Sequence, residues 1–147
     1  MSSEIYNHLK NLQSSWDSVG DAHRDYLKKI KHDFNFEPGV IYDIGACVLG
    51  WTKSAKAVWP TSQYFLFEAM EESEDLFVES GHNYHIGVLG NEDGKIVTFY
   101  KNVNSPGGNS YYMENQEFSP VADHLFAGNE NQFSRKMDTL RDRKSVV

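Results

Sequence analysis

The segment from Val40 to Gly50 constrains the fold more than any other part of this 147-residue chain. It begins with the apolar run VIY at residues 40–42 and continues as DIGACVLG over residues 43–50. A strand without polar alternation is typical of a parallel sheet, whose strands are buried on both faces. Glycines at the carboxyl end of such a strand permit a tight turn and let a ligand approach the backbone closely. The segment therefore predicts an α/β fold with a ligand site where this strand ends.

Strand and helix patterns alternate after this point. Strands are predicted at 40–44, 63–67 and 84–89, and helices at 53–58 and 71–80. Pro60 stops the first helix and Gly81 the second. This order predicts a parallel sheet with right-handed crossovers. A turn at 91–94 then precedes a β-branched and aromatic run at 95–100, which indicates an antiparallel or peripheral hairpin.

An apolar stripe marks the first thirty or so residues as helix. Its members recur at steps of three and four: Ile5, Leu9, Leu12, Trp16 and Val19, continued by Tyr26, Leu27 and Ile30. Gly20-Asp21 interrupts the stripe, and Asp21 is placed to cap a second helix. The simpler interpretation is a helix packed on the domain; a paired helix in a dimer is the alternative, because the spacing is also heptad-like. We therefore expect an N-terminal helical segment at 1–36 and a domain at 37–147.

Charge and composition argue against several classes of protein. The formal net charge of −7 argues against nucleic-acid and anionic-membrane partners, because both select for clustered Lys and Arg. No apolar stretch approaches the ~18–20 residues that span a bilayer, and the N-terminus lacks the features of a signal peptide. The single cysteine, Cys47, cannot form an internal disulfide and fits a reducing cytoplasm. A cytoplasmic location is the expectation.

A second acidic residue follows the next strand. Glu68 ends the apolar run YFLF, about twenty residues after the first motif. A carboxylate there can accept two hydrogen bonds from the ribose hydroxyls of a bound adenosine. A solvated glutamate is the alternative, because the nearby segment 71–74 is also acidic. Neither the dinucleotide fingerprint G-x-G-x-x-G nor a phosphate loop ending in Gly-Lys-Ser/Thr occurs. The order of Asp43 and Glu68 favours a cofactor site.

The ordered series of motifs resembles the FkbM-type S-adenosylmethionine-dependent methyltransferases. VIYDIGA at 40–46 looks like their motif I, and YFLFEA at 64–69 looks like their second strand with its ribose-binding acid. Residues 87–100 resemble the third strand and the hairpin after it. Residues 107–112 resemble a Gly/Ser segment, and 137–140 a threonine-leucine stretch. The resemblance covers about residues 38 to 142.

The resemblance implies a Rossmann-like parallel sheet of the class I methyltransferase type. It implies S-adenosylmethionine as the cofactor, held by Asp43, Gly45, Ala46 and Glu68. The reaction implied is methyl transfer to an oxygen of a sugar or another small hydroxylated acceptor. No residue stands out as the catalytic base. The alternative is a non-catalytic remnant that serves as a binding or assembly module.

The chain departs from the family pattern at two places. Motif I has one residue more before its last glycine, which leaves the roles of residues 47–50 open. Family members continue after the threonine-leucine stretch with further strands of a seven-stranded sheet, whereas Arg141 stands where an aspartate is usual and the chain ends at Val147. We therefore expect a domain that is incomplete on its C-terminal side, with an open sheet edge. This edge would be covered by the N-terminal helix, by the 118–134 segment, by a second copy of the chain or by a separately encoded remainder. A second copy would make the protein a homo-oligomer, joined through that edge or through the N-terminal helix.

Other reactive side chains carry weaker signals. His82 and His85 are three residues apart, but no third ligand accompanies them, so no metal site is predicted. Cys47 lies in the cofactor loop without an obvious base, which favours a packing or backbone role over a nucleophile.

Overall fold

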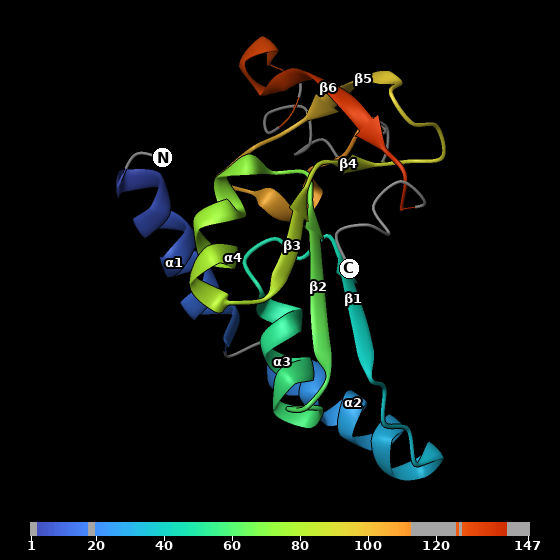
Figure 1. Ribbon diagram of the computed structural model, residues 1–147. Helices are drawn as coiled ribbons and strands as arrows, with labels where there is room; N and C mark the ends of the chain where they lie inside the picture. The colour runs from blue at the N-terminus through green and yellow to red at the C-terminus, as the bar shows by residue number, and fades with distance from the viewer. Residues whose placement is uncertain (1–2, 18–19, 113–125, 127, 141–147) are drawn as a thin grey trace, which may run out of the picture. The chain divides into compact units, whose positions relative to one another are not determined.

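The protein is an α/β chain whose computed structural model describes residues 3–17, 20–112, 126 and 128–140 (Figure 1). It divides into two compact units, Met1–Ile86 and Gly87–Val147. The N-terminal helices belong to the same unit as the predicted parallel strands, and the division falls at 86/87, whereas the sequence suggested 36/37. No helix in the described ranges has the length and apolar character needed to cross a bilayer.

The first unit combines four α-helices with three strands. The helices are α1 (Ser3–Asp17), α2 (Gly20–Phe34), α3 (Gly50–Val58) and α4 (Glu74–Ser80), and the strands are β1 (Val40–Ile44), β2 (Gln63–Glu68) and β3 (Asn83–Ile86). The strand order is β1-β2-β3, and both pairings are parallel. The parallel sheet expected from the alternating pattern is therefore confirmed.

The core of this unit lies between β1, β2 and the helices. After Gln63, every residue of β2 is buried, as expected for a central strand. One core cluster joins Ile41 of β1 to Tyr64 of β2 and to Leu27, Ala55, Val58 and Trp59 of the helix layer. The alternate residues of β1, among them Tyr42 and Ile44, remain exposed. β1 is an edge strand among the described strands, so the expected cover of this edge stays a prediction.

Helix α1 packs on the body of the first unit, where it contacts α2, α3, α4 and the 3-10 turn η1 (Glu71–Ser73). Lys10 forms an ion pair with Glu79 of α4 at 2.8 Å, and the Tyr6 hydroxyl donates to the same carboxylate at 2.7 Å. This is the simpler of the two interpretations of the apolar stripe. Pairing of α1 between two chains stays a prediction.

Three predicted elements of the first unit differ from the structure. The helix predicted at 71–80 begins with the 3-10 turn η1, and its α-helical part, α4, starts at Glu74. Helix α3 begins at Gly50, three residues earlier than predicted. The single strand predicted over 84–89 is wrong, because two strands occupy this stretch. β3 ends at Ile86 after pairing with β2, and β4 (Val88–Leu89) belongs to a different sheet in the second unit.

The second unit contains a small mixed sheet built from β4, β5 (Ile96–Tyr100) and β6 (Gln132–Asp138). Its order is β4-β6-β5, with β6 parallel to β4 and antiparallel to β5. The turn at 91–94 joins β4 to β5, yet these strands do not pair with each other. Instead the N–H groups of Gly90 and Gly94 donate to carbonyls of β6, each at 2.9 Å. The predicted hairpin is therefore replaced by a strand insertion that the sequence did not reveal.

Parts of two predicted segments lie outside the described residues. Of the segment 118–134, which was proposed to cover the open sheet edge, only Phe126 and residues 128–134 are described. The last residues of the stretch that resembles the family, after Leu140, also lie outside the described residues.

Candidate functional site

The predicted site lies at the carboxyl ends of β1 and β2, where the loop of residues 45–50 leads into α3. Gly45 has a φ of 83°, which favours glycine, and Cys47 and Leu49 also take positive φ values of 48° and 69°. The N–H groups of Gly45 and Ala46 donate to the carbonyl of Phe67 at 2.8 and 3.1 Å. The loop therefore turns sharply across the end of β2.

Glu68 connects the end of β2 to this loop. Its Oε2 accepts a hydrogen bond from the N–H of Cys47 at 2.8 Å. Its Oε1 accepts from the N–H groups of Ala69 and Met70, each at 2.8 Å. Burial raises the pKa of this carboxyl group, whose residue is 9% exposed, and the three backbone hydrogen bonds oppose that rise. The side chain thus stabilises two turns at once.

Asp43 is buried on the helix-facing side of β1. Its Oδ2 accepts a hydrogen bond from the Thr52 hydroxyl in the first turn of α3. Burial raises the pKa of Asp43, and the hydrogen bond from Thr52 lowers it. The negative charge of Asp43 also adds to the raised pKa of Glu68. The structure therefore brings the two predicted carboxylates into one site, where Asp43 ties β1 to α3.

Helix α1 supports the loop from the other side. The buried amide of Gln13 donates from Nε2 to the carbonyl of Val48 at 2.9 Å. Trp16 lies so close to Gly50 that a Cβ there would be 3.0 Å from Cε3 of the indole. The sequence did not single out Gln13 or Thr52. A usable signal existed for Gln13, because its place between Leu9 and Trp16 puts a polar side chain on the apolar face of α1.

A cavity of about 300 Å³ adjoins the loop. Its lining comprises Trp16, His23, Gly45, Ala46, Cys47, Gly50 and Trp51. Burial, followed by the charge of Glu68, raises the pKa of the Cys47 thiol to about 12. The thiol therefore stays protonated at neutral pH, in agreement with a packing role and against a nucleophile. Gly45 and Ala46 line this cavity, whereas Asp43 and Glu68 do not.

The raised pKa of Asp43 makes stability depend on pH. Because the pKa of Asp43 is raised in the folded state, the folded state holds the Asp43 proton more tightly than the unfolded state does. Just above the ordinary aspartate pKa, the folded state therefore binds more protons than the unfolded state. The free energy of unfolding should therefore fall as pH rises through that range and level off above the folded-state pKa. Asp43→Asn keeps an acceptor for Thr52 and removes the ionisable group, so urea unfolding across this range should show a smaller fall. An unchanged slope would contradict the role of Asp43.

The two histidines do not converge. His82 and His85 lie three residues apart around β3, and such spacing points side chains to opposite faces of a strand. The His82 ring contacts Tyr64 at 5.2 Å between centroids, and the His85 ring contacts Phe67 at 6.4 Å. Within the described ranges, no group of three or more His, Cys, Asp or Glu side chains is placed to hold a metal ion.

The Gly/Ser segment at 107–112 lies in the second unit. It includes the 3-10 turn η2 (Pro106–Gly108), and Ser110 forms an antiparallel bridge with Tyr100.

Comparison of the chain with protein-family models, curated proteins and solved structures gave no match. The candidate site therefore stands on its own geometry: a tight loop at the end of a parallel strand, a carboxylate that anchors it, and a cavity beside it.

Proposed function

We propose that the loop cavity binds S-adenosylmethionine, on a Rossmann-like sheet of the class I methyltransferase type, and that the protein transfers the methyl group. The observation that carries this proposal is the cavity beside the loop after β1, at the carboxyl edge of parallel strands. Ligands bind at this edge in open α/β sheets. The resemblance of the motifs supports the same cofactor.

The residues present suit the cofactor in two respects. The cavity is mostly lined by apolar and backbone groups, and its volume of about 300 Å³ is at the lower end for small-molecule sites. Trp16 and Trp51 line it, and indole faces attract cations such as a sulfonium. Glu68 suits the cofactor less fully. Glu68 does not line the cavity. A carboxylate has about four acceptor positions, and three backbone N–H groups already use three of them, so at most one remains for a ribose hydroxyl.

S-adenosylmethionine supplies a methyl group that its sulfonium already activates. The protein's own contribution is then to align the acceptor, exclude water and remove a proton. Among the cavity-lining residues, His23 is the side chain suited to accept that proton, because the Cys47 thiol stays protonated. We propose a sugar or another small hydroxylated molecule as the acceptor, on the strength of the resemblance alone.

A second candidate is a non-catalytic binding or assembly module. The occupied carboxylates favour it, because Glu68 holds three backbone N–H groups and Asp43 holds Thr52. In this case both acids serve the fold, and neither serves a cofactor.

Calorimetric titration of the full chain with S-adenosylmethionine and S-adenosylhomocysteine tests the cofactor proposal. We expect micromolar binding, and about a fivefold loss of affinity in Trp16→Leu, since a partly desolvated cation–π contact contributes ~1 kcal/mol. Tyr26→Leu is the matched control, because Tyr26 is 65% exposed on α2 and does not line this cavity. A folded chain that binds neither compound would refute the cofactor proposal and favour the second candidate.

A further inference from the structure

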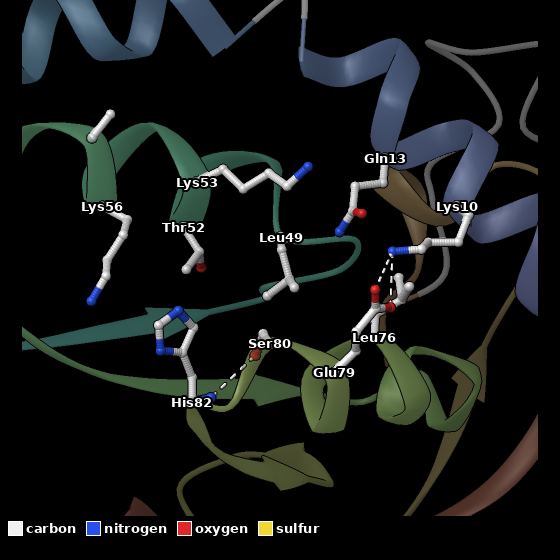
Figure 2. A pocket seen from close by; sticks show the side chains of 11 residues that line it. Lys10, Gln13, Leu49, Thr52, Lys53, Lys56, Leu76, Glu79, Ser80 and His82 are labelled. Atoms are coloured by element: carbon white, nitrogen blue, oxygen red, sulfur yellow. Dashed lines mark hydrogen bonds and ion pairs between the residues drawn. The ribbon is translucent and has the colours of Figure 1, made fainter. Parts of the chain in front are cut away.

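A second cavity lies among α1, α3 and α4 in the first unit (Figure 2). Its volume is about 420 Å³, and it shares no lining residue with the loop cavity. Its deepest lining residues are Leu49, Thr52 and Leu76, which are 4%, 2% and 2% exposed. Leu49, Ala57 and Leu76 are its apolar lining residues, and the other eight are polar or charged. A concave site that combines apolar surface with polar groups can hold a small molecule.

Positively charged side chains surround these apolar residues. Lys10, Lys53 and Lys56 all line the cavity, and Glu79 is its one acidic lining residue. Lys10 is paired with Glu79 at 2.8 Å, and Lys53 is paired with Asp17 at 3.2 Å. The end of the cavity near Lys10 is therefore close to neutral, because the ammonium and the carboxylate offset each other there.

The opposite end of the cavity is lined by two basic side chains, Lys56 and His82. Figure 2 shows Lys56 and His82 together at this end, away from the Lys10–Glu79 pair. Among the described contacts, Lys56 Nζ lies 5.2 Å from the centroid of the Tyr64 ring, an aromatic and not an anionic partner. Burial lowers the pKa of His82, and the charge of Lys56 lowers it further. An anionic group placed between these two side chains would interact favourably with the ammonium and with a protonated imidazole.

We propose that this cavity binds a small organic phosphate, with the phosphate group between Lys56 and His82 and the apolar part of the ligand on Leu49 and Leu76. A phosphate has oxygens enough to accept from an ammonium and an imidazole at once. The neutral Lys10–Glu79 end then faces the uncharged end of the ligand. The site is independent of the proposed cofactor cavity, so each can be tested without the other.

The test uses the full chain and follows the His82 ring signals by NMR, with His82→Gln to assign them. The probes are inorganic phosphate and phenyl phosphate, each compared with chloride at equal ionic strength. We expect both phosphates to raise the pKa of His82. Phenyl phosphate should bind about tenfold more tightly than inorganic phosphate, because its ring removes apolar surface from water.

Variants of Lys56 separate a site from general charge attraction. Lys56→Met should weaken phenyl phosphate binding about tenfold, as expected for a lost charged hydrogen bond, and Lys56→Arg should retain most of the affinity. Lys29→Met is the matched control, because it makes the same charge change at an exposed position on α2 that does not line the cavity. If Lys56→Met does not fold, the His82 titration of the unaltered chain decides the question.

Three results would overturn the proposal. The first is a His82 signal that neither phosphate perturbs. The second is an equal loss of affinity in Lys29→Met and Lys56→Met, which would indicate long-range attraction only. The third is binding of benzoate as tight as that of phenyl phosphate, which would exclude specificity for phosphate.

Discussion

Replacing Glu68 by alanine is expected to lower the free energy of unfolding by about 3–5 kcal/mol. The carboxylate accepts hydrogen bonds from the N–H groups of Cys47, Ala69 and Met70, each at 2.8 Å. Alanine leaves all three donors without this acceptor, and a buried unsatisfied donor costs ~1–3 kcal/mol. Urea unfolding followed by circular dichroism measures the change.

Glu68→Gln provides the matched comparison. Its amide oxygen can still accept from Ala69 and Met70, but its NH₂ group would face the N–H of Cys47, another donor. We expect about half the loss seen with alanine, together with faster hydrogen exchange at the Cys47 amide. If both variants unfold like the unaltered chain, Glu68 does not hold the loop.

The same folded glutamine variant also tests the cofactor: if Glu68 contacts the ribose, affinity for S-adenosylmethionine should fall by about 1–3 kcal/mol.

The second large effect is expected for Leu9→Ala in α1, at about 2–5 kcal/mol of unfolding free energy. Leu9 is 0% exposed, and α1 contacts α2, α3, α4 and η1. Removing its side chain should leave a void between α1 and the rest of the first unit. Urea unfolding monitored by tryptophan fluorescence and by circular dichroism measures both the loss and its cooperativity.

Leu12→Ala is the control, because Leu12 lies on the same helix but is only partly buried. It should cost clearly less than Leu9→Ala. A negligible effect of Leu9→Ala, or two separate transitions, would mean that α1 folds independently of the sheet. That outcome would agree with a boundary at 36/37 instead of the observed unit that ends at Ile86.

The order of strands and helices in the first unit could be predicted because the sequence patterns that indicate these elements are local. The apolar runs of β1 and β2, the stop at Pro60 and the positive φ of Gly81 each depend on a few neighbouring residues. The positions of Gly45 and Glu68 at strand ends follow from the same runs. Sequence alone therefore predicted the parallel pairing and the edge where the candidate site lies.

Strand pairing in the second unit depended on distant residues. β6 lies between β4 and β5, although more than thirty residues of chain separate it from β5. The turn-forming residues at 91–94 favoured a hairpin between β4 and β5. In the structure, the N–H groups of Gly90 and Gly94 donate hydrogen bonds to β6 instead. A local pattern does not encode which of two possible partners a strand takes, because that choice depends on the summed long-range contacts.

The apolar runs of the sequence predict an α/β chain with a parallel sheet, and they place an acidic residue at the end of each of its first two strands. The roles of these two acids depend on contacts that are visible only in the folded chain. Glu68 binds three backbone N–H groups and Asp43 binds Thr52, while Gln13 reaches the loop from a helix thirty-five residues away. The physical reason is that a buried carboxylate or amide is stable only when hydrogen-bonded, and its partners are selected by packing between elements that sequence spacing does not relate.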